Sequence, residues 1–180
     1  MFGVVSSLVS LSEREAAEEA SPAAALQILR GKLDALARAS DATFSEMRVS
    51  GDPESGADIE KLVCAVMMPH SGRYSAEGPT VEVCSKNVTA LALVLHELAT
   101  NAVKHGSLSQ KAGRVLVEWK TLEPGLLVRW EEQGGPAIES EPVRHGFGTR
   151  MMERYVRSLG GEIEFKWPRD GLTVSITLYH

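Results

Sequence analysis

The sequence predicts an α+β protein in two parts, a helical hairpin over residues 1–50 and a two-layer α/β sandwich over residues 57–180. Two observations predict the second part: a long helix with two different faces, and a change after it from a period of 3.6 to a period of two. A leucine seam predicts the hairpin. The turn-forming run Gly51-Asp-Pro-Glu-Ser-Gly56 marks the boundary between the parts.

Composition narrows the class of protein. Of the 180 residues, 43% are hydrophobic and 24% are charged, as in ordinary globular proteins. The net charge of −5, with no basic patch, argues against nucleic acid as a partner. No apolar run approaches the ~20 residues that span a bilayer. Cys64 and Cys84 lack metal-ligand spacing and the start lacks a basic signal region, so we expect a cytoplasmic chain without a membrane segment.

The N-terminal segment reads as two helices. The first covers about Val4 to Ala20, and Ser21-Pro22 restarts the helix with a cap and a proline at the first position. The second carries a heptad seam of leucines, Leu26, Leu29, Leu33 and Leu36. A hairpin this small cannot bury its seam alone, so we expect a homodimer with a four-helix bundle. The alternative is that the seam packs against this chain's own C-terminal domain.

The C-terminal part alternates helices and strands. We expect a helix from Asp58 to Met68 capped by Asp58, a loop to Pro79, a strand around 80–84 and a helix from Val88 to Gly106. A hairpin over 115–132, a helix over 149–159 and a second hairpin over 163–178 follow. This order predicts a mixed, largely antiparallel sheet with helices on one face.

The central helix has two faces with different chemistry. Its apolar stripe comprises Val88, Leu91, Ala92, Leu95, Leu98, Ala99 and Ala102. Glu97, Asn101 and Lys104 lie on the other side, a turn apart. An acid, an amide and a cation in one patch can hold a metal ion and the phosphates that it bridges.

Two glycine-rich stretches follow, Trp130-Glu-Glu-Gln-Gly-Gly-Pro136 at a strand end and His145-Gly-Phe-Gly-Thr-Arg150 at a helix start. Glycines let the backbone approach an anion, and a helix N-terminus offers free N–H groups. Each signal is weak alone, because polar pairs and turn glycines are common. All three in this order, each on a fitting element, form a specific pattern.

Together the three stretches resemble the N box and the two glycine boxes of the Bergerat-type ATPase domain of histidine kinases. The resemblance covers about 57–178 and points to the HWE subfamily, which is recognised by a His in the N box and a Trp-x-Glu before the glycines. Here these residues are His96, Trp130 and Glu132. The N-terminal hairpin resembles, more loosely, the dimerisation and phosphotransfer helices of the same family.

The resemblance implies ATP and Mg²⁺ as cofactors, with Asn101 as the metal ligand and Glu97 and Lys104 as catalytic residues. Glu132 stands where most relatives carry Asp, and would accept a hydrogen bond from the adenine amino group. Residues 136–145 would form the ATP lid. The cofactor-binding residues would be Asn101, His105, Glu132, Gly134, Gly135, Gly146, Phe147, Gly148, Thr149 and Arg150.

Several residues have a simpler interpretation. Trp130 is expected to support the core rather than stack on a base, and Met151 and Met152 to pack inside. His96 is expected to bond within the fold, and His105 also suits a helix C-terminal cation. His70 has no partner that the sequence identifies.

The family's phosphoacceptor His falls upstream of Met1 in the best match, and no His precedes His70. The chain is expected either to begin after its acceptor or to have lost it. The leading interpretation is a histidine kinase core that passes phosphate to the receiver domain of a response regulator. The alternatives are a non-catalytic dimeric adaptor or phosphotransferase, and a serine kinase of the anti-sigma type.

Overall fold

The computed structural model describes residues 56–141 and 146–179. The predicted hairpin over 1–50, its homodimer and its boundary at 51–55 lie outside these residues.

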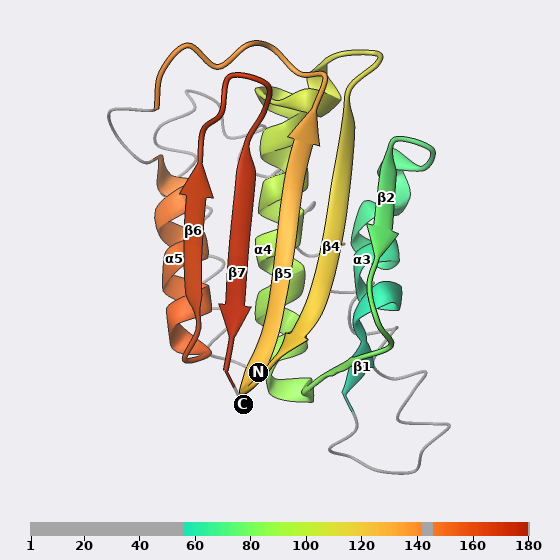
Figure 1. The fold of residues 1–180 in the computed structure, drawn as a ribbon, viewed down its shortest axis with the longest axis vertical. Helices are drawn as coiled ribbons and strands as arrows, with labels where there is room; N and C mark the ends of the chain where they lie inside the picture. Colours follow the sequence, from blue (N-terminus) through green and yellow to red (C-terminus); the bar gives the residue numbers. More distant parts are fainter. Residues whose placement is uncertain (1–55, 142–145, 180) are drawn as a thin grey trace, which may run out of the picture.

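The described part is built on a five-stranded sheet with the order β2-β4-β5-β7-β6 (Figure 1). Strand β2 runs parallel to β4, and the other neighbours are antiparallel. The strands are β2 (Tyr74–Glu77), β4 (Arg114–Leu122), β5 (Gly125–Gln133), β6 (Glu162–Lys166) and β7 (Thr173–Leu178).

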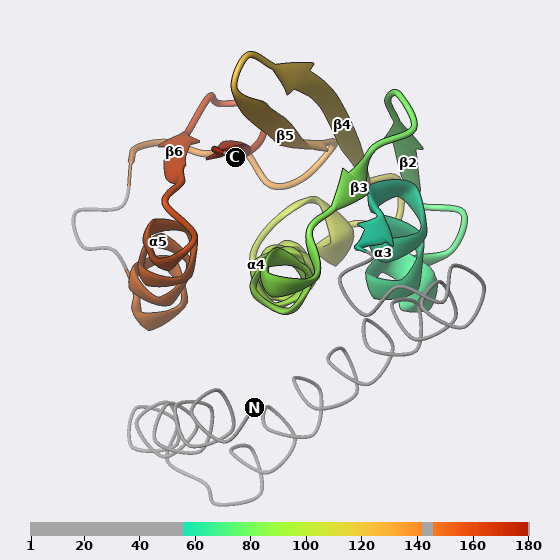
Figure 2. The ribbon, with the colours of Figure 1, turned by 90° about the horizontal axis from the view of Figure 1, so that it is seen from below.

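Helices α3 (Ile59–Met67), α4 (Ser85–Lys104) and α5 (Phe147–Ser158) cover one face of this sheet, side by side (Figure 2). Short 3₁₀ turns, η1 (Met68–His70) and η2 (Ser107–Ser109), follow α3 and α4. The prediction of a mixed sheet with helices on one face is therefore confirmed for the described residues.

The core lies between α4 and the sheet. Every residue of the predicted apolar stripe of α4 is buried, and the inward residues of β4, β5 and β7 meet it in a single apolar cluster. The period-two pattern is visible in β4, where Val115, Val117 and Trp119 are buried while Glu118 and Lys120 are exposed.

The helix ends follow the local sequence. The Asp58 side chain caps α3 by accepting from the Lys61 N–H at 3.1 Å. Helix α5 closes with Gly160 donating to the Arg157 carbonyl and Gly161 to the Val156 carbonyl, both at 3.0 Å. These boundaries agree with the predicted ones within two residues.

The sequence did not predict two strands. The segment expected to be loop contains β2, and Ala57–Asp58 forms a two-residue strand, β1, that pairs with β3 (Glu82–Val83). Both are short, and β2 pairs with β4, some 40 positions away, so no local period reveals them. The partner strand decides their structure, which makes the expected loop over 69–79 wrong in part.

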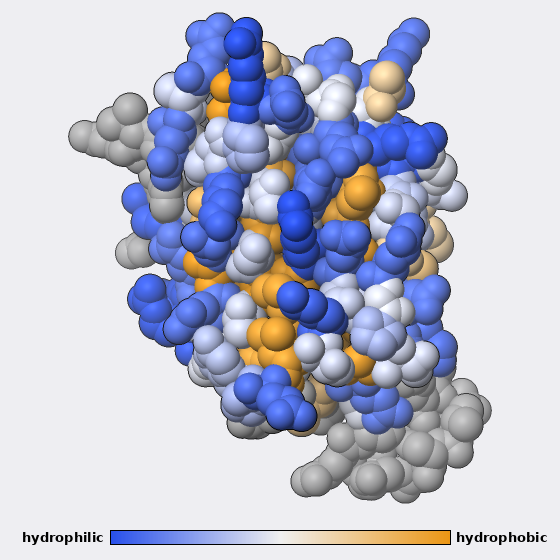
Figure 3. Space-filling model, in the orientation of Figure 1, coloured by the Kyte–Doolittle hydropathy of each residue, from blue (hydrophilic) through white to orange (hydrophobic). Residues whose placement is uncertain are grey.

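The sheet face opposite the helices is open and mostly hydrophilic, with apolar atoms near its middle (Figure 3). Charged side chains alternate outward there, with Glu118 and Arg129 facing each other on β4 and β5. Within 56–141 and 146–179, no helix is both long enough and apolar enough to cross a membrane.

Candidate nucleotide site

Helix α4 carries the predicted acid and amide to the start of α5. The two helices pack side by side and run in opposite directions (Figures 1 and 2). A Cβ placed on Gly148 would lie 3.4 Å from Oε2 of Glu97 and 3.8 Å from Nδ2 of Asn101. The N-box side chains and the second glycine stretch, about 50 positions apart in the chain, thus face each other.

The start of α5 offers its backbone to this gap. Gly146 stands at the N-cap in an extended conformation, and no described side chain caps the helix there. The first turn contains no acid, so its amide groups and positive dipole end are suited to an anion. Thr149 is half-buried and Arg150 is exposed, whereas the Phe147 side chain lies outside the described residues.

The residues just after the C-terminal end of α4 meet the first glycine stretch through Glu132. This carboxylate is 4% exposed, and its Oε2 accepts from the Ser107 N–H at 2.6 Å. Its Oε1 lies 3.4 Å from the indole nitrogen of Trp130, two positions earlier on the same face of β5. Oε1 therefore keeps most of its capacity to accept a hydrogen bond.

Glycines allow this close approach. A Cβ on Gly106 would lie 1.9 Å from Oε2 of Glu132, and one on Gly135 would lie 2.9 Å from the Ser107 backbone. Gly106 has φ −106°, so a side chain is excluded there by the carboxylate rather than by the backbone angle. Gly134, with φ +70°, turns the chain directly after the end of β5.

Burial raises the pKa of the Glu132 carboxyl, and hydrogen bonds from Ser107 and Trp130 only partly oppose the rise. The folded chain therefore holds this proton more tightly than the unfolded chain does. Stability contributed by the protonated form is fully present below the ordinary glutamate pKa of 4.5 and is lost as the pH rises through the higher native value.

We therefore expect Glu132→Gln to gain stability relative to the parent chain as the pH rises from 5 to 8. Glutamine keeps an oxygen for the Ser107 N–H but carries no charge. Urea unfolding of both chains at several pH values measures the difference in unfolding free energy. Glu131→Gln, on the open face of the same strand, controls for the loss of one carboxylate. A stability difference that does not change with pH would contradict the expectation.

The remaining predicted residues are more peripheral. Lys104 and His105, at the end of α4, are exposed. The first residues of the predicted lid, 136–141, are mostly exposed, but Ile138 is half-buried and its N–H donates to the Arg169 carbonyl at 3.0 Å. The lid is thus attached to the β6–β7 turn at this point, and its residues 142–145 lie outside the described part.

Most of the simpler interpretations agree with the structure. Trp130 is 0% exposed, and Met151 and Met152 are buried, as predicted. His96 is half-buried in α4. Burial lowers the pKa of His70, and the positive charge of Arg73 lowers it further.

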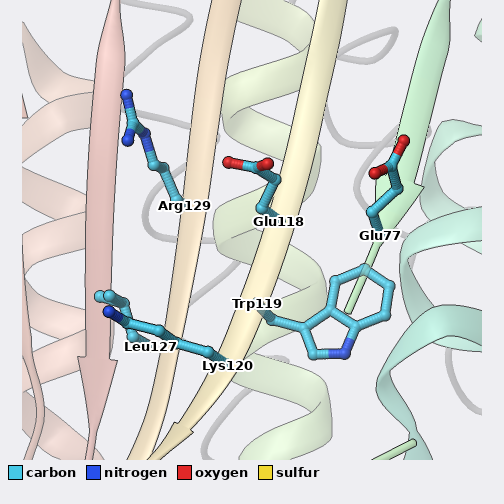
Figure 4. A pocket seen from close by; sticks show the side chains of 6 residues that line it. All are labelled: Glu77, Glu118, Trp119, Lys120, Leu127 and Arg129. Carbon is cyan, nitrogen blue, oxygen red and sulfur yellow. The ribbon is translucent and has the colours of Figure 1, made fainter. Parts of the chain in front are cut away.

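A hollow of about 320 Å³ lies on the open face of the sheet (Figure 4). The residues that line it are Glu77, Glu118, Trp119, Lys120, Leu127 and Arg129. They include two acids and two bases, and none of them is a predicted site residue. Arg129 is also paired with Glu131 at 2.7 Å. We interpret this hollow as part of a solvated sheet face.

No sequence pattern pointed to Ser107, which bonds to Glu132, or to Arg73, which bonds to the connection that contains Ser107. Ser107 supplies a backbone group, and any residue but proline has that group. Arg73 stands in the segment expected to be loop. Gly106 was predicted only as the end of the central helix, whereas it also makes room for Glu132.

The donor set suits Mg²⁺. Glu97 and Asn101 are oxygen donors on adjacent turns of one helix, and magnesium is commonly held by one or two protein ligands together with phosphates and water. In the described residues, no group of three or more His, Cys, Asp or Glu could hold a metal ion alone. Glu97 and Asn101 therefore fit a metal ion that is bound together with a phosphate group.

The fold is that of histidine kinase catalytic domains. The histidine kinase domain of the Erythrobacter litoralis EL346 blue-light activated histidine kinase matches 81% of this chain and 75% of its own, with a TM-score of 0.62 and 21% identity. The ATP binding domain of PrrB from Mycobacterium tuberculosis matches 71% of this chain and 98% of its own, with a TM-score of 0.52 and 18% identity.

Relatives in sequence are blue-light-activated histidine kinases, which confirms the resemblance to histidine kinases. The chain is 38% identical, over 99% of its length, to blue-light-activated histidine kinase 1 of Erythrobacter litoralis. It is 32% identical, over 99% of its length, to the blue-light-activated histidine kinase of Rhizobium johnstonii. It is 31% identical, over 97% of its length, to the blue-light-activated histidine kinase of Brucella anthropi. The chain spans 49%, 49% and 35% of these proteins, respectively. No family model matches the chain.

Proposed function

We propose that this chain is the ATP-binding catalytic core of an HWE-type histidine kinase. The observation that carries the proposal is the approach of the α5 N-terminus to the α4 acid and amide, with the Cβ position of Gly148 3.4 Å from Oε2 of Glu97. An anion at those helix amides lies beside a carboxylate and an amide that can share a cation with it.

At the phosphate end each residue has a distinct role. Asn101 would offer its amide oxygen to Mg²⁺, whose charge would offset that of the phosphates. Glu97, one turn earlier and 6% exposed, would orient a water or the attacking nucleophile. Lys104, in the last turn of α4, and Arg150, in the first turn of α5, are exposed and would offset phosphate charge.

At the base end Glu132 accepts a hydrogen bond from the amino group of adenine through Oε1, since Oε2 is held by Ser107. The glycine turn 134–135 packs against the backbone of Ser107, Ala112 and Gly113, and a side chain at Gly135 would lie only 2.9 Å from Ser107.

The proposal extends to partners. The acceptor of the phosphate is a histidine upstream of this segment or on another chain, and the receiver domain of a response regulator takes the phosphate from it. The N-terminal hairpin would form the homodimer. These assignments depend on the family resemblance.

Titration with Mg-ATP, followed by thermal unfolding, tests nucleotide binding. ATP at a hundredfold over its dissociation constant stabilises the folded chain by about 2.7 kcal/mol. We expect this shift in the parent chain and its loss in Asn101→Ala, whereas Gln133→Ala, an exposed amide on β5, should keep it. The absence of a shift in the parent chain would favour the non-catalytic adaptor.

A further inference from the structure

Arg73 lies immediately before β2 and fastens the connection between α4 and β4 (residues 105–113). Its Nη1 donates to the Leu108 carbonyl at 3.1 Å, and its Nε and Nη2 donate to the Gly113 carbonyl at 3.2 and 3.0 Å. Nη2 also donates to the Gln110 carbonyl. One half-buried guanidinium therefore holds three carbonyls of a single connection.

The same connection is held on its other side by the base end of the proposed site. The Ser107 N–H donates to Glu132, and the glycine turn 134–135 packs against Ser107 and against the backbone of Ala112 and Gly113. The connection is folded tightly on itself, because a Cβ on Gly113 would lie 1.8 Å from the Ser107 carbonyl oxygen. A shift at the Arg73 side would therefore displace the Ser107 amide.

The geometry points to Arg73 as a positioning residue for the base of the nucleotide. By fixing the α4–β4 connection, Arg73 places the Ser107 N–H, which engages Oε2 of Glu132 and leaves Oε1 directed to the ligand's amino group. This inference rests on the proposed function, since it assumes that Glu132 receives the adenine.

The role requires the planar fork of arginine and not only its charge. A guanidinium carries five N–H donors in fixed directions, which suit several carbonyls at once, whereas a lysine ammonium is a compact point charge. Arg73→Lys should therefore lose the function while keeping the charge.

The test compares Mg-ATP with the Mg complex of purine riboside 5′-triphosphate, which has the same phosphates but lacks the 6-amino group. Calorimetric titration gives both dissociation constants for each variant. The parent chain should prefer ATP by about tenfold, the worth of one hydrogen bond to a charged group. In Arg73→Lys this preference should fall close to one, while the affinity for the analogue changes little.

Two further variants sharpen the test. Arg129→Lys, on the open sheet face, should keep the preference for ATP, since Arg129 pairs with Glu131 away from the site. Glu132→Gln should lose part of the preference, and adding Arg73→Lys should then have less effect than it has in the parent chain, because both residues act through one hydrogen bond.

An unchanged preference in Arg73→Lys would overturn the positioning role, and so would an equal loss for both ligands. If the lysine variant does not fold, the same two ligands are compared with Arg73→Gln, whose amide group keeps N–H donors. If neither variant folds, Arg73 is required for folding alone and the inference is wrong. A parent chain that binds neither ligand would instead refute the proposed function.

Discussion

Gly106→Ala is expected to destabilise the folded chain by about 3–5 kcal/mol, through crowding and the loss of a buried hydrogen bond. The added methyl carbon would lie 1.9 Å from Oε2 of Glu132 and 2.9 Å from the Ala102 Cα. Glu132 would have to move, which would leave the Ser107 N–H without its carboxylate. Denaturant unfolding monitored by circular dichroism measures the effect.

Two controls isolate the cause of this loss. Gly146→Ala should cost little stability, because a Cβ there would have no neighbour within 4 Å and the φ of −62° suits any residue. Combining Gly106→Ala with Glu132→Ala should cost less than the sum of the two single changes, because the clash with the carboxylate would be gone and only the close approach to Ala102 would remain. Full additivity would mean that Gly106 matters for a reason other than the carboxylate.

Gly148→Ala is expected to lose nucleotide affinity by about ten- to a hundredfold while the folded chain keeps or gains stability. The methyl group would lie at ordinary contact distance from Glu97, and alanine favours a helix over glycine by about 1 kcal/mol. It would nevertheless occupy the gap where phosphates approach the α5 amides. Losing one or two hydrogen bonds to a charged ligand, each worth about 1.5–3 kcal/mol, accounts for the reduced affinity.

Mg-ATP titration by calorimetry, together with thermal unfolding without ligand, separates these two effects. Ser158→Ala at the other end of α5 is the matched control, since Ser158 is exposed and bonds only to the Tyr155 carbonyl in the described structure. A Gly148→Ala chain that binds ATP as tightly as the parent chain would place the phosphates elsewhere.

The sequence predicted the helices and strands whose own residues show a hydrophobic repeat. Helix α4 and the two hairpins were recognised because their buried residues repeat every three to four or every two positions. Strand β2 was not, because its four residues, three half-buried and one exposed, carry no hydrophobic period of their own. Its structure depends on the distant β4.

The candidate site, too, was predicted only in part from the sequence. Motif order suggested that Glu97, Asn101 and Gly148 meet, and the structure brings them together. The surroundings of Glu132 could not be predicted, because, apart from Trp130, its contacts are with the backbone of Ser107 and Gly106, and such contacts do not depend on side-chain identity. The roles assigned to these residues stay predictions until ligand binding is measured.

Helix α4 also sets the distance between the two ends of the proposed site. Glu97, within the helix, faces one end of the proposed site. Gly106, two residues past the helix end and nine positions after Glu97, faces the other end. At about 1.5 Å per residue, this separation is about 13 Å. A free base or a free triphosphate can engage only one end, so full affinity requires a molecule that carries both groups at that spacing.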